Sequence, residues 1–208
     1  MPRVPYRRSA LMQVRLADNR ARIMRATRQL IARGGFRAAR ISAVAAEAGL
    51  STGSIYRYFA SQAQLFIEVL TAAVAHEIEL LERITAAAEP AAALRLQSAV
   101  EAFARRALEG RNLAYAFIAE PIGAQVEAAR LRSRREFSAV FQRLLLAGML
   151  RGEFPAQDAE VAAACIVGAF TEALVGPIAP GSKAVSPRSR ARLIDAIGRF
   201  CVAAVRSP

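Results

Sequence analysis

Apolar residues recur at spacings of three and four along almost the whole chain, and this periodicity constrains the fold more than any other feature of the sequence. Ile23, Leu30 and Ile31 follow it near the start, and Leu65 and Val69 follow it further on. Such a pattern gives each segment one apolar face as a helix, whereas a half-buried strand needs apolar and polar residues to alternate. No strand-type alternation is sustained in the sequence. The chain is therefore predicted to be all-α.

Glycine, proline and small polar residues mark the ends of about nine predicted helices. Residues 1–17 hold two prolines and four arginines with weak periodicity, so they are expected to form a mobile basic arm before a helix cap at Asp18 or Asn19. Gly34 and Gly35 are expected to end the first helix. The later helices are expected at about 41–48, 52–59, 61–87, 90–109, 113–118, 126–149, 158–175 and 188–205.

Positive charge is concentrated in the first third of the 208-residue chain. Residues 1–60 carry twelve arginines against Asp18 and Glu47, a net charge of +10, and the remainder is nearly balanced within a total of +12. Lys183 is the sole lysine, so nearly all of the cations are arginines. Arginine binds phosphates and guanine edges through two parallel hydrogen bonds. These counts predict an anionic partner, either nucleic acid or an acidic membrane surface, that binds near the N-terminus.

The composition argues against several classes of protein. One histidine (His76) and two cysteines (Cys165 and Cys201) give no zinc-like spacing, no disulfide framework and few candidates for a hydrolytic triad. No run reaches the ~18 consecutive apolar residues of a membrane span, and arginines interrupt the first thirty residues where a signal peptide would be apolar. The chain is expected to be cytoplasmic, without metal, cofactor or membrane contact.

The segment AEAGLSTGSIYRYF at 46–59 predicts a helix-turn-helix, in which two short helices meet at a tight turn on Gly49. The second helix of such a unit fits the major groove of DNA. The residues spaced for mutual burial are Val44, Ala45, Ala48, Ile55 and Phe59, and those left on the outer face are Thr52, Gly53, Ser54, Tyr56 and Arg57. The outer face has no large aliphatic residue that core packing would explain.

This region resembles the TetR family of bacterial transcriptional repressors, without gaps, over about fifty residues. The matching positions are Gly35-Phe36, Val44-Ala45, Ala48-Gly49-Leu50-Ser51, Gly53-Ser54-Ile55-Tyr56, Tyr58-Phe59 and Ser61-Gln62. The resemblance implies a DNA-binding domain at 18–62 and a ligand-binding and dimerisation domain at 63–208. It also implies a homodimer on a double-stranded operator, released by a small apolar effector, with no enzymatic activity. Beyond residue 80 the likeness is limited to length and helix count.

The resemblance also implies roles for single residues. Tyr56 and Tyr58 match phosphate contacts, whereas Thr52 and its neighbours match the stretch nearest the base edges. Two positions depart from the family pattern: Ala39 stands where a threonine cap is common, and Gln62 where a lysine is common. The predicted DNA-binding residues are Arg40, Ser42, Ser51, Thr52, Gly53, Ser54, Tyr56, Arg57, Tyr58 and Gln62.

The remaining candidates belong to the larger domain. The pocket candidates, each also explicable as core or surface, are Phe66, Phe103, Tyr115, Phe117, Gln125, Arg130, Phe137, Phe141 and Glu172, whereas His76 is expected to be an ordinary helix residue. The helix at 158–175 has little polar face, which favours burial against a second copy together with the last helix. The predicted dimer contacts are Ala164, Gly168, Phe170, Leu174, Leu193, Ile197, Phe200 and Cys201.

Two other functions remain open. The first is a basic protein that binds DNA or a membrane surface non-specifically, with no effector, through the basic arm and the arginine-rich first helix. An enzyme built on a helical cavity would need a nucleophile, a base and oxyanion donors together, and the sequence offers no such set.

Overall fold

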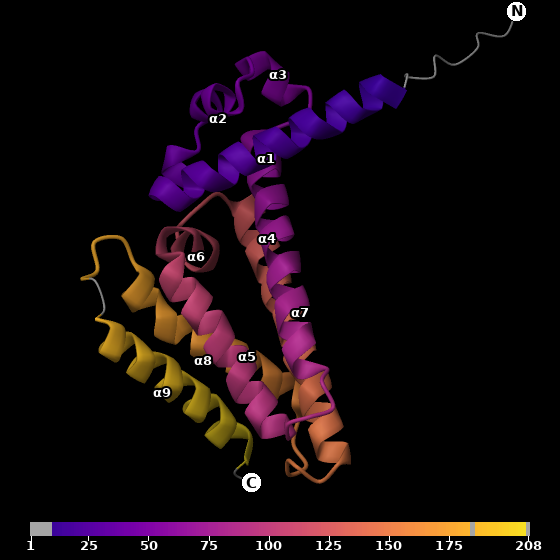
Figure 1. Ribbon diagram of the computed structural model, residues 1–208, viewed down its shortest axis with the longest axis vertical. Helices are drawn as coiled ribbons and strands as arrows, with labels where there is room; N and C mark the ends of the chain where they lie inside the picture. Colours follow the sequence, from indigo (N-terminus) through magenta and orange to yellow (C-terminus); the bar gives the residue numbers. More distant parts are fainter. Residues whose placement is uncertain (1–9, 184–185, 207–208) are drawn as a thin grey trace, which may run out of the picture.

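The computed structural model describes residues 10–183 and 186–206, with side chains from residue 12 onward, and over these ranges it is all-α, as predicted. The helices are α1 (Ala10–Ala38), α2 (Ile41–Ala48), α3 (Thr52–Tyr56), α4 (Gln62–Thr85), α5 (Ala92–Glu109), α6 (Arg111–Ile118), α7 (Ala124–Leu150), α8 (Ala159–Ile178) and α9 (Pro187–Arg206). Helices α1 to α3 form one end of the molecule, and α4 leads from them into a larger bundle (Figure 1).

Helix α1 begins earlier than predicted. It starts at Ala10, so the expectation of a mobile arm is wrong for residues 10–17, and residues 1–9 of that arm lie outside the described part of the chain. Both prolines of the arm precede Ala10, and the residues after it are good helix formers. At the other end, Gly34 (φ −157°, ψ 29°) and Gly35 (φ 70°, ψ −171°) interrupt the helix where its end was predicted.

The two short helices pack as the apolar spacing predicted. Helix α2 ends at Gly49, whose left-handed backbone (φ 63°, ψ 40°) directs its N–H to the carbonyls of Ala45 and Ala46. Helix α3 is shorter than predicted and stops at Tyr56, before the start of α4 at Gln62. The residues buried between these helices and α1 include all five expected ones: Val44, Ala45, Ala48, Ile55 and Phe59.

The larger bundle has its own core, called the lower core, which is separate from the core shared by α1, α2 and α3. Helix α7 lies against α4 and α8, and α5 packs against α9, α4 and α8. At its centre the Phe170 ring lies 4.8 Å from the Phe103 ring and 5.7 Å from the Phe141 ring, between centroids. The upper core around Phe36, Ile55 and the first half of α4 is a separate cluster that also takes in residues of α6 and α7. The boundary between the two clusters is where the cavity described below lies.

Helix α8 is long and apolar enough to cross a bilayer, by length and composition alone. Its inner face, however, packs into the lower core through Val167, Phe170 and Leu174. Core helices of soluble proteins satisfy the same length and hydropathy criteria, so α8 is accounted for as a core helix with one uncovered face.

Removing the Phe170 ring tests the lower core. Phe170 is fully buried between Phe103 and Phe141, so Phe170→Ala should lower the free energy of unfolding by about 3–5 kcal/mol through lost burial and a residual cavity. Urea denaturation followed by circular dichroism measures this. Leu94→Ala is the control because Leu94 is 53% exposed, and it should change stability by less than about 0.5 kcal/mol. Equal effects of the two substitutions would contradict the packing.

Candidate functional site

The outer face of α3 is open to solvent. Thr52, Gly53 and Arg57 are exposed, and Tyr56 is 54% exposed although it is aromatic. A Cβ atom built at Gly53 meets nothing within 4 Å, so no other part of the subunit covers the helix there. Arg40 and Ser42, at the start of α2, are exposed as well. These residues leave a polar helix surface free to approach a double helix.

Three side chains on this face, Ser51, Ser54 and Arg57, are linked by hydrogen bonds. The Ser51 Oγ accepts a hydrogen bond from the Ser54 backbone N–H (3.2 Å), which caps α3. The Ser51 and Ser54 hydroxyl oxygens are 2.9 Å apart, and Arg57 Nη2 donates to Ser54 Oγ at 3.0 Å. Ser51 therefore has a structural role in addition to its predicted one, and the Arg57 guanidinium is fixed against the helix that carries it.

Two of the predicted DNA contacts are partly engaged inside the protein. Gln62 Nε2 donates to the carbonyl of Ala39 at 3.1 Å, so the amide holds the start of α4 to the turn before α2. Tyr58 is half-buried, and its hydroxyl accepts from Asn19 Nδ2 at 3.1 Å. At Ala39, where the family pattern has a cap, the side chain is fully buried, and the N-cap residue Arg40 makes no side-chain capping bond.

Several arginines of α1 bind other parts of the protein. Arg33 forms two hydrogen bonds with the Glu47 carboxylate (2.8 and 3.0 Å), which lower the pKa of Glu47. Arg20 pairs with Glu68, and Arg22 Nη2 donates to the carbonyl of Ala48 at 2.5 Å, at the end of α2. Only part of the basic excess is therefore free to contact an anionic partner.

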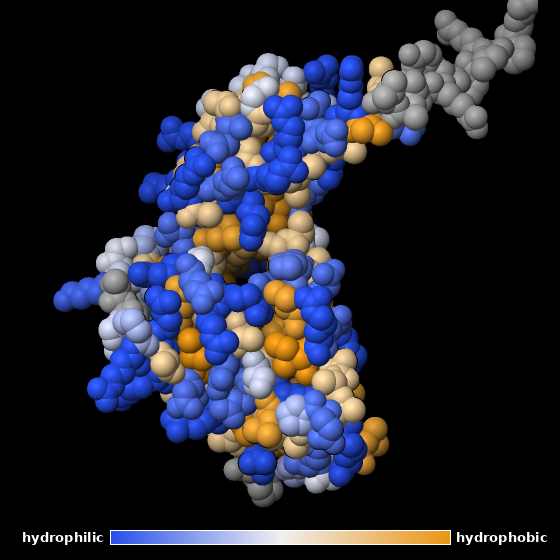
Figure 2. Space-filling view, in the orientation of Figure 1, coloured by the Kyte–Doolittle hydropathy of each residue, from blue (hydrophilic) through white to orange (hydrophobic). Residues whose placement is uncertain are grey.

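A cavity of about 670 Å³ lies beneath α1, among α4, α5, α6, α7 and α8. Its hollow is visible at the middle of the molecule, where hydrophobic surface is rimmed by hydrophilic side chains (Figure 2). Most of its lining is apolar, and of the predicted pocket residues Phe103, Phe117, Phe137 and Arg130 line it. This volume falls within the range of pockets that enclose small organic molecules.

The other predicted pocket residues lie elsewhere. Phe66 is buried in the upper core with its ring 4.9 Å from that of Phe36, and Phe141 is buried against Phe170. Tyr115 packs against the lower core without lining the cavity. Gln125 and Glu172 are exposed to solvent, away from the lining. Helical periodicity marks all of these positions, but it does not distinguish a side chain that fills space from one that borders an empty space.

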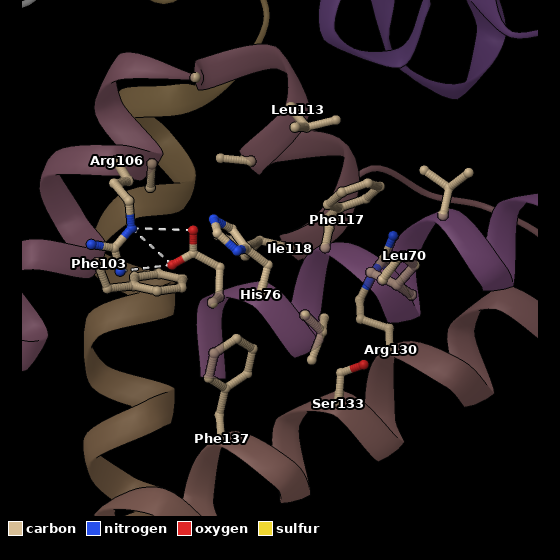
Figure 3. A pocket seen from close by; sticks show the side chains of 18 of the residues that line it. Leu70, His76, Phe103, Arg106, Leu113, Phe117, Ile118, Arg130, Ser133 and Phe137 are labelled. Carbon is tan, nitrogen blue, oxygen red and sulfur yellow. Dashed lines mark hydrogen bonds and ion pairs between the residues drawn. The ribbon is translucent and has the colours of Figure 1, made fainter. Parts of the chain in front are cut away.

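Several polar groups of the cavity were not predicted. Glu77 of α4 and Arg106 of α5 form a bidentate ion pair, with hydrogen bonds of 2.7–3.1 Å. His76, expected to be an ordinary helix residue, is exposed and lines the cavity beside this pair (Figure 3). Across the part of the chain that the structure describes, no group of three or more metal-ligating side chains occurs.

Arg130 is the most deeply placed cation of the cavity, with 8% of its surface exposed. Its Nη1 pairs with the Glu127 carboxylate at 2.7 and 2.9 Å, and its Nη2 donates to the carbonyls of Ala116 (3.0 Å) and Glu120 (2.7 Å). Its Nε is buried and has no hydrogen-bond partner in the structure. Arg130 therefore binds the end of α6 to α7 and retains one unused donor.

Helix α6 also holds the end of α1. Asn112 Nδ2 donates to the carbonyls of Ala32 (3.0 Å) and Arg33 (3.2 Å), and Glu120 Oε2 accepts from the backbone N–H of Phe36 at 3.0 Å. A Cβ atom at Gly35 would lie 2.5 Å from the Glu120 carboxylate, and its φ of +70° also favours glycine. Because Phe117 of α6 lines the cavity, the cavity wall and the end of α1 are joined through one short helix.

The predicted dimer residues fall on two opposite faces. Phe170, Leu174, Ile197 and Cys201 are buried inside the subunit, and burial raises the pKa of Cys201 to about 11. Their assignment to a dimer contact is corrected, since they have no surface left for a partner. Leu193 is half-buried, whereas Ala164, Gly168 and Phe200 are exposed, Phe200 to 62%.

Known proteins share this sequence pattern and fold. Residues 23–69 match the family model described as bacterial regulatory proteins, tetR family, and residues 89–174 match the tetracyclin repressor-like C-terminal domain. The HTH-type transcriptional repressor KstR of Rhodococcus jostii (strain RHA1) is 37% identical over 65 residues, which cover 31% of this chain and 29% of KstR. The chain thus spans less than a third of that curated relative.

Solved structures extend the likeness to most of the chain. The transcriptional regulator FadR from Bacillus subtilis, in complex with stearoyl-CoA, has a TM-score of 0.75 at 19% identity over 89% of this chain and 98% of FadR. RolR in complex with resorcinol has a TM-score of 0.64 at 20% identity over 92% of this chain and 96% of RolR. At these identities the likeness concerns the fold.

The contact between Glu120 and Phe36 can be tested by substitution. Glu120→Ala leaves the Phe36 N–H without its acceptor and should lower the free energy of unfolding by about 1–3 kcal/mol. Glu120→Gln keeps an acceptor oxygen and should cost much less. Hydrogen exchange at the Phe36 amide, alongside urea denaturation, measures both effects. Unchanged exchange in Glu120→Ala would show that the bond does not hold α1.

Proposed function

Because the chain belongs to the tetR family of bacterial regulatory proteins, which are DNA-binding and non-enzymatic, we propose that it represses transcription as a homodimer released by a small molecule. Each subunit places one α3 helix in a major groove of a pseudo-palindromic operator, with half-sites one or more helical turns apart. The effector binds in the cavity beneath α1. The protein acts in the cytoplasm, where its operator is.

The observation that carries the DNA-binding role is the uncovered polar face of α3. Tyr56 is exposed without a packing reason, and Gly53 leaves the backbone of the helix open to close approach. Phosphate contacts from Tyr56 and Arg40 supply affinity that does not depend on sequence, whereas Thr52, Ser54 and Arg57 select the bases. Tyr58 and Gln62 orient these residues from behind, and their DNA contacts are secondary.

The cavity supports an effector-released repressor. Most of its lining is apolar, and two solved structures of the same fold hold a small molecule, stearoyl-CoA in one and resorcinol in the other. An effector releases DNA only if it binds the DNA-free conformation more tightly than the DNA-bound one. The bonds from Asn112 and Glu120 to the end of α1 give a physical route, since a shift of α6 on ligand binding would displace α1, together with α2 that packs on it and α3 that packs on α2.

The uncovered face of α8 and α9 supports the homodimer. Val161 and Phe200 are each more than half exposed, and Ala164, Cys165 and Gly168 lie on the same outer side of α8 as Val161. A Cβ atom at Gly168 meets nothing within 4 Å, so the backbone is free to approach another helix closely there. Burial of this face against its equivalent in a second copy gives a two-fold interface.

The DNA-binding role is tested with an operator selected from a random DNA pool. Tyr56→Phe should weaken binding to operator and unrelated DNA alike, by about tenfold, because it removes a hydrogen bond to a charged phosphate. Arg57→Ala should weaken operator binding by about 1–3 kcal/mol while affecting unrelated DNA less. Fluorescence anisotropy at ~150 mM salt measures both.

Arg105→Ala is the matched control, since Arg105 is an exposed arginine of α5 far along the chain from α3. It should leave both affinities unchanged. Equal affinity of the unaltered protein for operator and unrelated DNA would instead favour a non-specific basic DNA-binding protein, because specific sites are typically preferred by ~10³ or more.

The dimer is tested at Gly168. Gly168→Glu fits the isolated subunit, because the space is open and glutamate favours a helix more than glycine does, but it buries a charge between two copies. Analytical ultracentrifugation should show a monomer with unchanged helicity. Leu150→Glu, at a site 90% exposed at the end of α7, should remain dimeric. A dimeric Gly168→Glu protein would contradict the proposed interface.

A further inference from the structure

The cavity combines an apolar interior with several cations. Within the described residues, five arginines line it: Arg25, Arg28, Arg106, Arg130 and Arg134. The acidic residues of the lining, counted over the same part of the chain, are two, Glu77 and Glu109. Glu77 neutralises Arg106, and Arg130 is paired with Glu127. The net charge of the residues around the cavity is therefore positive, because the acidic partners neutralise only some of the arginines.

Three of these arginines have no acidic partner among the described residues. Arg25 and Arg28 of α1 and Arg134 of α7 are exposed, and no hydrogen bond or ion pair of their side chains occurs among the residues described. The deeper lining, by contrast, is buried and apolar, as at Leu70, Val74 and Phe103. Polarity is thus graded from a cationic opening to an apolar interior, which fits the hydrophilic rim around the hollow (Figure 2).

We infer that the effector of the proposed repressor is an amphiphilic anion, with a carboxylate or phosphate head and an apolar body. The body occupies the space among α4, α5, α6 and α7, and the head lies near Arg25, Arg28 and Arg134. Arginine suits such a head because its planar guanidinium forms paired hydrogen bonds with carboxylates and phosphates. This inference rests on the proposed function, since it names the chemistry of a ligand for the same cavity.

A second polar anchor lies deeper. The buried Nε of Arg130 is a donor with no partner, while its other two nitrogens are fully engaged. An oxygen on the body of the ligand, such as a carbonyl, would satisfy this N–H, whereas a purely hydrocarbon body leaves it unpaired. Ser133, next along the same face of α7, is also buried in the lining (Figure 3).

The position of the head explains how the ligand reaches the DNA-binding end. Arg25 and Arg28 belong to α1, which packs on α2, whereas Arg134 belongs to α7 of the larger bundle. A single anion held between them links the two parts of the protein directly. Its binding favours one spacing of α1 and α7, and this is the differential affinity that an effector needs.

Three probes of equal chain length test the inference: dodecanoate, dodecyl phosphate and uncharged dodecanol, each used below its aggregation concentration. Calorimetry on the full chain should show that both anions bind at least about tenfold more tightly than dodecanol, with a preference that shrinks as salt rises. Whichever anion binds more tightly identifies the head as carboxylate or phosphate. Operator release, followed by anisotropy, is measured with the same probes.

Arg28→Ala and Arg134→Ala should each weaken binding of the anions about five- to tenfold and leave dodecanol unchanged, because only the head contacts these side chains. Arg105→Ala, an exposed arginine of α5 outside the lining, should change neither. Arg134→Ala should also leave operator affinity without ligand unchanged, since Arg134 lies on α7 away from α3.

The outcomes separate the inference from the proposed function. Dodecanol binding as tightly as the anions, or anion binding unchanged in both variants, overturns the anionic head while the effector cavity stands. Anion binding that never releases the operator overturns the effector role of the cavity while the head assignment stands. Failure of all three probes to bind overturns both.

Discussion

The attachment of α6 to the broken end of α1 is the contact on which the rest of the structure depends. Gly34 and Gly35 interrupt α1, which exposes carbonyl and N–H groups that a continuous helix would use internally. Asn112, in the first turn of α6, and Glu120, two residues past its end, bond to these groups. Helix α6, which forms a wall of the cavity, is therefore also the support of the DNA-binding end. The cavity and the helix-turn-helix are both attached to this one helix.

The use of positive charge follows from this arrangement. The sequence places most of the basic excess before residue 61, which suggests at first that all of it serves DNA. In the structure Arg20, Arg22 and Arg33 bind α4 or α2, while Arg25 and Arg28 turn toward the cavity. Helix α1 thus holds the helix-turn-helix together on one side and lines the ligand cavity on another. In the proposed function, DNA binding through α2 and α3 and effector binding at Arg25 and Arg28 would both act on α1, so the coupling between them would be local.

Local spacing made part of this predictable from the sequence. Val44 and Ile55 lie within one short motif, where helical period and a glycine turn determine which residues meet, and both are buried as expected. The Glu77–Arg106 pair joins two different helices, and no local pattern indicates which residues of separate helices come together. The cavity was missed in part for the same reason, because an aromatic residue that borders it follows the same period as one that fills the core.

The two faces of α8 show a second limit. Phe170 and Leu174 face the core while Ala164 and Gly168 face solvent, yet both sets are apolar and both repeat at four residues. A helix without a polar face carries no sequence signal for which side is inner. Burial in the subunit and burial in a dimer therefore look alike until the neighbouring helices are placed. The prediction fails at the start of α1 for a simpler reason: the prolines, arginines and weak periodicity of residues 1–17 indicate an arm, although residues 10–17 are good helix formers.

The coupling free energy between effector and operator tests the central claim most directly. The operator dissociation constant would be measured with and without saturating dodecanoate, for the unaltered protein and for Glu120→Ala. If α6 carries the signal, ligand should weaken operator binding by a factor in the usual range of about 5–150 in the unaltered protein, and by much less in the variant. An equal factor in both proteins would contradict the account, because release would then proceed without the contact between α6 and α1.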